Sequence, residues 1–143
     1  MNERVDVLIV GGGPGGLACA ADLAAGGVRV LLAERKAKIG AKVCAGGITW
    51  NGLIRLVPEA LIEAAFPEQH IVTGRQRAVV AEANPIVATV NRERLGQWMA
   101  QRAAAAGADL RTGCRVLRVE GGRATLEDTA GRQTRITFDF LVG

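Results

Sequence analysis

The glycine run GGGPGG at residues 11–16 constrains the fold of this chain more than any other feature. It follows an apolar run, RVDVLIV (4–10), and precedes a stretch rich in alanine and leucine that a glycine pair ends. The β-branched run predicts a strand, and the alanine-rich stretch predicts a helix from about residue 15 to 25. A second apolar run, VRVLLAE (28–34), predicts another strand. The chain therefore opens with a βαβ unit whose parallel strands are buried on both faces.

The spacing of these glycines predicts a loop that binds the phosphates of a nucleotide. Gly11, Gly13 and Gly16 form the pattern G-x-G-x-x-G between a strand and a helix, which is the context that the pattern requires. Gly11 lets the chain turn off the strand, Gly13 lets a pyrophosphate approach the backbone, and Gly16 lets the helix pack close to the sheet. Pro14 suits the start of the helix, where its missing N–H costs nothing. The N-terminus of the helix then attracts an anion.

Glu34 completes this dinucleotide-binding pattern at the end of the second strand, 18 residues after Gly16. A carboxylate there can accept hydrogen bonds from the ribose hydroxyls of an adenosine, and it repels a 2′-phosphate, so NADP is not expected in this site. Arg35 either flanks the adenine or is solvated. The competing interpretation, a structural glycine turn beside a solvated glutamate, is disfavoured because strand, loop, helix, strand and acid occur in register.

The rest of the chain predicts an α/β fold. Residues 35–57 are expected to form a long loop with a helical turn near 53–56, and residues 58–66 a short helix that begins at a proline. Residues 71–90 predict two or three strands, and residues 91–107 predict a helix with an asparagine N-cap. Further strands are expected at 108–113, 114–120, 123–128, 132–138 and 139–143, with a hairpin turn at Gly121–Gly122.

Composition excludes several classes of function. The net charge is +4, but the basic residues are scattered along the sequence and aromatic residues are only 3%, which argues against a nucleic-acid partner. The three cysteines are far apart, which favours a reducing, cytoplasmic compartment over a disulfide framework. His70 is the only histidine, so no metal site and no Ser-His-Asp triad is predicted.

Four segments together resemble a known family. They are DVLIVGGGPGGLACAADLAAGGVRVLLAERK, KVCAGGI, VNRERLGQWMAQRAAAAGADLRTGCRVLRVE and FDFLVG. The chain resembles, over essentially its whole length, the FAD-dependent oxidoreductases of the p-hydroxybenzoate hydroxylase fold, and within them the geranylgeranyl reductase family. The resemblance implies a Rossmann-like FAD-binding domain with a central parallel sheet and an antiparallel β-meander.

The resemblance also implies roles for residues that bind the cofactor. The FAD pyrophosphate would lie against the glycine loop, and Glu34 would bind the adenosine ribose. Arg92 would lie along the pyrophosphate or ribityl part of FAD, although a solvated arginine is the alternative. Val116 would contact the adenine through its backbone. The loop residues that the resemblance assigns to the pyrophosphate are Gly11, Gly13, Pro14, Gly15 and Gly16.

The segment KVCAGGI is the part of the resemblance that concerns catalysis. Cys44 would lie near the isoalloxazine ring, as a proton source or as a group that tunes the flavin, whereas an inert loop cysteine is the alternative. Gly46 and Gly47 would allow ring and substrate to approach closely. Ala45 interrupts the run of glycines that usually follows the cysteine in the reductases. The aromatic-ring monooxygenases of the same fold have no reason to carry this segment, so it favours a reductase.

The expected function is the FAD-binding portion of a reductase that acts on isoprenoid C=C bonds. NADPH or another donor would reduce the flavin, and the substrate would be a small molecule or a prenyl lipid, with peripheral membrane contact. An aromatic-ring monooxygenase and a non-catalytic module that binds FAD or ADP stay open as alternatives. An Ala-Asp-Gly loop is expected after Gly143, so residues 1–143 would be an incomplete domain, without the C-terminal substrate-binding part and inactive alone.

Overall fold

The computed structural model describes residues 2–41, 44–53 and 56–143 of the chain. Clustering of its contacts divides the chain into two compact units. The first combines residues 1–41 with residues 96–143, and the second comprises residues 42–95. Each unit has its own sheets.

The first unit is built on a four-stranded parallel sheet. Its strand order is β13-β2-β3-β9. The strands are β2 (Val7–Val10), β3 (Val30–Ala33), β9 (Asp109–Arg111) and β13 (Phe140–Val142). Helix α1 (Pro14–Ala25) connects β2 to β3, so the predicted βαβ unit is confirmed.

A second four-stranded sheet in this unit contains the predicted meander. Strands β10 (Arg115–Glu120), β11 (Arg123–Glu127) and β12 (Gln133–Thr137) pair in antiparallel order. Strand β1 (Asn2–Arg4) adds to β12 in parallel. The α/β class with a central parallel sheet and an antiparallel meander is therefore confirmed.

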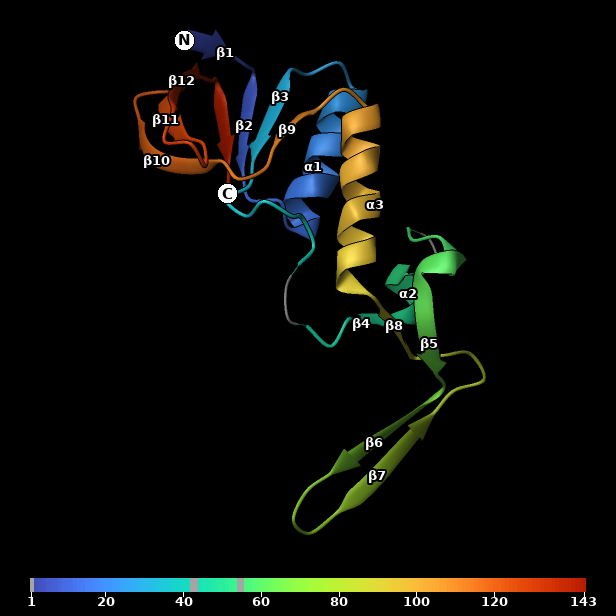
Figure 1. Cartoon of the computed structure of the whole chain (residues 1–143). Helices are drawn as coiled ribbons and strands as arrows, with labels where there is room; N and C mark the ends of the chain where they lie inside the picture. The colour runs from blue at the N-terminus through green and yellow to red at the C-terminus, as the bar shows by residue number, and fades with distance from the viewer. Residues whose placement is uncertain (1, 42–43, 54–55) are drawn as a thin grey trace. The chain divides into compact units, whose positions relative to one another are not determined.

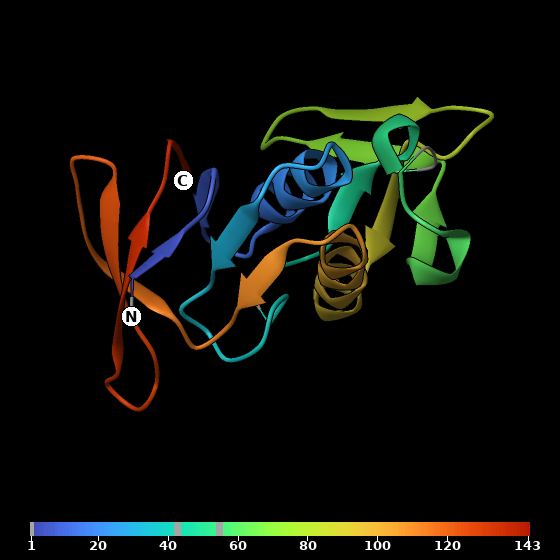
Figure 2. The same cartoon turned by 90° about the horizontal axis from the view of Figure 1, so that it is seen from above.

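Side-chain alternation along β2 and β3 explains how the layers stack. Ile9 and Leu32 point to the face covered by α1 and by α3 (Arg92–Ala105), which lie side by side (Figure 1). Leu8 and Leu31 point to the opposite face and pack on the meander. All four side chains are almost completely buried. A buried leucine or isoleucine contributes about 1.5–3 kcal/mol, so both faces of this sheet stabilise the unit. The meander lies on the other side of the parallel sheet from the helices (Figure 2).

The second unit contains a short antiparallel sheet and a separate hairpin. The sheet has the order β4-β8-β5, and the hairpin pairs β6 with β7. The elements of this unit are β4 (Gly47–Thr49), α2 (Trp50–Leu53), the 3₁₀ helix η1 (Glu59–Leu61), β5 (Ile62–Phe66), β6 (Glu68–Val72), β7 (Arg77–Ala81) and β8 (Val87–Val90).

Among the described residues of both units, no helix is both long and apolar enough to cross a membrane.

The strand predicted at residues 4–10 is confirmed at residues 7–10 as β2, but its start is wrong, because Arg4 ends a separate strand, β1, in another sheet. Strand β1 pairs with β12 and ends at Arg4, whereas β2 pairs with β3 and begins at Val7. Asp6 lies at this change, where its carboxylate accepts hydrogen bonds from the backbone N–H (2.9 Å) and guanidinium of Arg29. The same hydrogen bonds hold the pKa of Asp6 below its usual value. A polar interaction with a distant residue thus interrupts an apolar run.

The short helix predicted at residues 58–66 is also wrong. Only Glu59–Leu61 is helical, as one 3₁₀ turn, and the next five residues form β5. Pairing of β5 with β8 overrides the helical propensity of the alanines, since sheet contacts outweigh propensities of tenths of a kcal/mol. The helical turn expected near 53–56 is displaced to Trp50–Leu53, and Ile54 and Arg55 lie outside the described residues. The strands predicted at 71–90 are confirmed as β6, β7 and β8.

Candidate functional site

The glycine loop turns between β2 and α1 in a conformation that requires glycine at two positions. Gly11 has a φ of +113°, a conformation that side chains disfavour, and its N–H donates to the carbonyl of Ala33 at 2.9 Å. A Cβ atom on Gly16 would overlap the carbonyl oxygen of Gly11. Glycine at these two positions is therefore required for the helix to begin so close to the sheet.

The start of α1 is open toward solvent. Pro14 is the first helical residue, and the cap residue Gly13 has no side chain to occupy the amides of the first turn. A Cβ atom on Gly13 or Gly15 would meet nothing within 4 Å. Free backbone N–H groups at a helix N-terminus bind anions, and the open space leaves room for one. This arrangement fits the pyrophosphate of a dinucleotide.

The carboxylate of Glu34 is oriented by two backbone amides. The N–H of Gly12 donates to Oε2 at 2.7 Å, and the N–H of Lys36 donates to Oε1 at 2.8 Å. Each carboxylate oxygen keeps a second lone pair that can accept a ribose hydroxyl. Sequence reasoning missed Gly12, although its signal was a glycine between Gly11 and Gly13 that the G-x-G-x-x-G pattern does not require. A Cβ atom there would lie 3.1 Å from Cβ of Glu34, so Gly12 lets this carboxylate reach the loop.

The start of β10 lies beside Glu34. The N–H of Cys114 donates to the carbonyl of Glu34, and the N–H of Gly113 donates to that of Lys36, both at 2.9 Å. Val116 is two residues further on, half-buried, and packs with the meander core. Arg35 is exposed. The first unit thus brings the glycine loop, Glu34 and the beginning of β10 to one edge of the parallel sheet.

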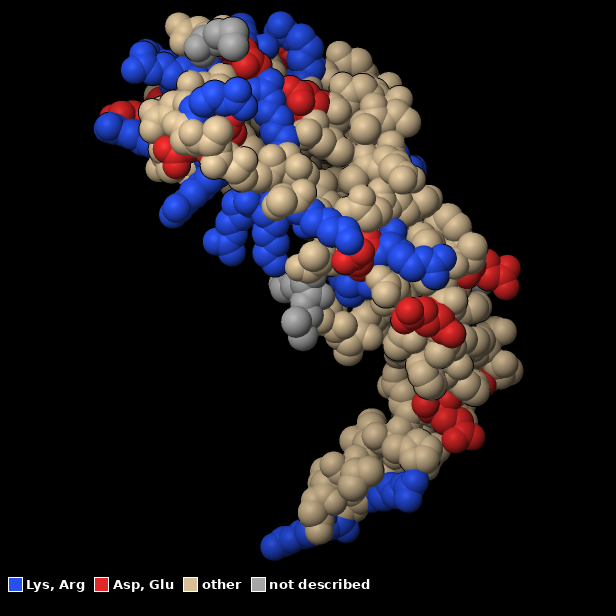
Figure 3. Space-filling view, in the orientation of Figure 1, with Lys and Arg blue, Asp and Glu red and all other residues tan. Residues whose placement is uncertain are grey.

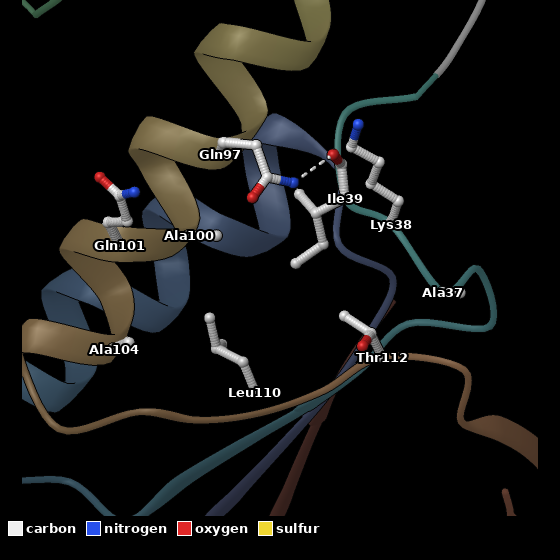
Figure 4. Close-up of a pocket in the computed structure, with 9 residues that line it drawn as sticks. All are labelled: Ala37, Lys38, Ile39, Gln97, Ala100, Gln101, Ala104, Leu110 and Thr112. Atoms are coloured by element: carbon white, nitrogen blue, oxygen red, sulfur yellow. Dashed lines mark hydrogen bonds between the residues drawn. The ribbon is translucent and has the colours of Figure 1, made fainter.

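The chain after Glu34 is held against α3 (Figure 4). Nε2 of Gln97 donates to the carbonyl of Ile39 at 2.7 Å. A Cβ atom on Gly96 would lie 2.6 Å from Cα of Gly40, which has a φ of +86°. A cavity of about 360 Å³ beside this contact is lined by residues of α3 and of this loop, among them Lys38 and Gln97. Sequence reasoning missed both glycines, since only the fold brings them together.

In the second unit, Gly46 lies directly against β8. Its φ is +73°, a Cβ atom on it would overlap the carbonyl oxygen of Val90, and its own carbonyl accepts the N–H of Val90 at 3.0 Å. The N–H of Gly46 lies 3.5 Å from Sγ of Cys44, which is exposed. Gly47 is exposed and pairs with Thr89 of β8. The Cys-x-Gly-Gly segment is thus fixed by its glycines and leaves the thiol accessible.

Arg92 follows β8 at the start of α3. The predicted N-cap is confirmed, because Oδ1 of Asn91 accepts the N–H groups of Glu93 and Arg94, both at 3.0 Å. The Nε atom of Arg92 is buried and has no hydrogen-bond partner among the described residues. Buried donors are nearly always paired, so this guanidinium suits an anionic ligand.

Thiol labelling is expected to distinguish the cysteines. Cys44 is exposed, whereas Cys114 is buried and burial raises the pKa of its thiol. Because the thiolate is the nucleophile, iodoacetamide at about pH 8 should modify Cys44 at least about tenfold faster than Cys114. Mass spectrometry of peptides over time measures both rates, and denatured protein, in which they should converge, is the control. Equal rates in the folded protein would contradict this placement.

The fold and site define a class of protein. A parallel βαβ unit with an open glycine loop, an acid that ends the second strand and a meander on the opposite face are typical of dinucleotide-binding flavoproteins. The family model described as "FAD binding domain" matches residues 4–143. The chain therefore belongs to the FAD-binding domain family.

Similar proteins refine this assignment. Geranylgeranyl diphosphate reductase of Rhodobacter capsulatus is 36% identical over 113 residues, which are 77% of this chain and 28% of that protein. The crystal structure of a geranylgeranyl bacteriochlorophyll reductase-like protein of Thermoplasma acidophilum has a TM-score of 0.86, with 24% identity over 99% of this chain and 39% of that one. The expected resemblance to geranylgeranyl reductases is thus confirmed, and this chain spans less than half of each relative.

The same fold occurs in monooxygenases. p-Nitrophenol 4-monooxygenase of Pseudomonas putida has a TM-score of 0.77, with 18% identity over 99% of this chain and 42% of that one. A likeness at this level of identity reports the fold alone. The fold therefore does not separate the reductase from the monooxygenase.

Proposed function

We propose that this chain is the FAD-binding portion of a flavin-dependent oxidoreductase that reduces isoprenoid C=C bonds. The observation that carries the reductase assignment is its sequence identity with the geranylgeranyl diphosphate reductase of Rhodobacter capsulatus. The geometry supports the cofactor, because the glycine loop is open at Gly13 and the carboxylate of Glu34 is oriented beside it.

The residues of the chain suit successive parts of FAD. The pyrophosphate would be bound by the backbone of the glycine loop at the start of α1, and the ribose hydroxyls by Glu34. Val116 would contact the adenine through its backbone. Arg35, which directly follows Glu34, is exposed and would flank the adenine. Arg92 would donate its buried Nε to an anionic or ribityl oxygen of the cofactor.

Reduction of an isolated C=C bond requires a hydride for one carbon and a proton for the other. Reduced FAD supplies the hydride chemistry, and NADPH or another donor restores the reduced cofactor. Cys44 would supply the proton, because its thiol is exposed on a segment that its glycines fix in place. Gly47 is exposed and would let substrate and cofactor approach closely, whereas the missing side chain of Gly46 makes room for β8 and places the segment. The substrate would be a small isoprenoid or a prenyl lipid.

A spectroscopic titration tests the cofactor assignment. After incubation with FAD and removal of free FAD by gel filtration, the chain should retain the visible absorption bands of flavin, and NADP should not compete for the site. Failure to bind FAD would overturn the proposal. In the complete protein, anaerobic reduction followed by a geranylgeranyl substrate should return the oxidised spectrum and yield a reduced chain. Oxygen consumption driven by NADPH and an aromatic effector would assign the protein to the monooxygenases instead.

Cys44→Ser tests the proposed proton donor. In the complete protein, the variant should bind FAD normally but reduce substrate about a hundredfold more slowly, which is the usual range for loss of a general acid. Stopped-flow measurement of flavin reoxidation by substrate separates this step from cofactor binding. Cys19→Ser, on α1, is the matched control and should react at the rate of the wild type. An unchanged rate in Cys44→Ser would leave that cysteine without a catalytic role.

A further inference from the structure

Arginines that are scattered in the sequence gather on the outer face of the meander sheet. Ala124, Leu126 and Ile136 point inward and are buried, so their neighbours in β11 and β12 point outward. The register then places arginines of all four strands on one face. This arginine face comprises Arg4 of β1, Arg115 and Arg118 of β10, Arg123 of β11 and Arg135 of β12, all exposed.

The positive charge of the arginine face is only partly compensated. Arg118 pairs with Glu120 and Arg4 with Asp139, each at 2.7 Å, but both pairs are exposed and such pairs bind weakly. The other members, Arg115, Arg123 and Arg135, form no ion pair or side-chain hydrogen bond with a described residue. The register also places Glu127 opposite Arg115 and Glu120 opposite Arg123, so the face carries five arginines and two glutamates. Figure 3 shows many Lys and Arg side chains around the part of the molecule that carries the meander, with acidic side chains interspersed among them.

The register gives the face a regular spacing. Thr125 of β11 lies between Arg135 and Arg118 on its neighbouring strands, and Thr137 of β12 lies between Arg4 and Arg123. Adjacent strands are about 4.8 Å apart, so the arginines of each such row are about 10 Å apart, with a hydroxyl between them. Donors spread in this way over a sheet face suit several phosphates in one plane better than one anion in a pocket.

We propose that the arginine face binds the surface of a bilayer that contains anionic phospholipids. Guanidinium groups bind phosphate oxygens with two hydrogen bonds, and threonine hydroxyls can donate to the same headgroups. The outward positions described in the register include no aromatic side chain on which a nucleic-acid base could stack. The centre of the face also lacks the apolar or aromatic anchors that dominate protein interfaces. A lipid surface is the partner that requires neither feature.

Vesicle sedimentation tests this surface without any enzymatic turnover, so its outcome is independent of the proposed reductase activity. The chain with FAD should sediment with vesicles of phosphatidylcholine mixed with phosphatidylglycerol, and not with phosphatidylcholine alone. The triple variant Arg118→Gln, Arg123→Gln, Arg135→Gln should bind the mixed vesicles about a hundredfold more weakly, at about fivefold per arginine. Raising the salt concentration should weaken binding of the wild type in the same way.

The matched control is Arg75→Gln, Arg77→Gln, Arg94→Gln, which removes the same charge from exposed arginines of the second unit. It should bind like the wild type, and thermal unfolding should show that both triple variants are folded. Equal loss of binding in the two variants would overturn the proposal, because net charge alone would then explain it. Absence of vesicle binding in the wild type would also overturn it. If an RNA oligomer bound the arginine face instead, the partner would be a nucleic acid.

Discussion

Gly13→Ala is expected to abolish FAD binding without destabilising the folded chain, whereas Gly16→Ala is expected to impair both. Gly13 has a φ of −75°, which any residue adopts, and a Cβ atom on it meets nothing within 4 Å. Its added methyl group occupies only the space into which the pyrophosphate would come, so we expect FAD affinity to fall at least about a hundredfold, or about 2.7 kcal/mol.

Gly16→Ala differs because the new Cβ overlaps the carbonyl oxygen of Gly11, which belongs to the backbone and cannot rotate away. Forcing α1 from the sheet should cost about 1–3 kcal/mol of stability. Thermal unfolding of the FAD-free proteins measures stability, and flavin fluorescence titration measures affinity. Normal FAD binding by Gly13→Ala would show that the pyrophosphate does not lie on the open side of the loop. Equal stability of both variants would contradict the close packing at Gly16.

Gly46→Ala is expected to destabilise the second unit by about 2–5 kcal/mol. The positive φ of +73° costs an alanine roughly 1–2 kcal/mol, and overlap of its Cβ with the carbonyl of Val90 adds about 1–3 kcal/mol. The adjacent Gly47→Ala is the control, because its new Cβ would lie 3.9 Å from Cγ1 of Val87, an ordinary contact. The two changes add the same methyl group one residue apart.

Urea unfolding followed by the fluorescence of Trp50, which directly follows β4, measures this difference. Gly46→Ala should shift the midpoint to lower urea, and Gly47→Ala should stay near the wild type. If both variants unfold like the wild type, Gly46 is replaceable and the segment that carries Cys44 is not fixed by its contact with β8. A large loss in Gly47→Ala alone would contradict the structure outright.

The parts of the fold that could be predicted are those whose signal lies within one segment. Residues 7–10 and 30–33 are apolar at every position, and a glycine directly follows the first of these runs, so strands of a buried parallel sheet were predictable. Asn91 was predictable as a helix cap because its effect reaches only three residues. The end of pairing at Asp6 and the strand at residues 62–66 were not predictable. They depend on Arg29 and on β8, which are distant in the sequence.

The same distinction applies to the site. The glycine loop and Glu34 form a local pattern with fixed spacing, and the structure brings them into hydrogen-bond contact through Gly12. The contact of Gly40 with Gly96 joins segments far apart in sequence, and nothing in either segment indicates the other. The arginine face is similar, because scattered basic residues become a surface only once the strand register is known.

The position of β1 has a consequence for how the chain is made. Asn2 pairs with Arg135, and β2, which supports the glycine loop, gains its neighbour β13 only at residues 140–142. At synthesis rates of about 5–20 residues per second, the N-terminal strands wait on the order of ten seconds for these partners. During that time the apolar edge of β2 is open to other chains. Pairing between segments so distant also slows folding itself. Completion of the two sheets beside the cofactor loop is therefore a late event, and a chaperone or early cofactor capture has most to contribute in that interval.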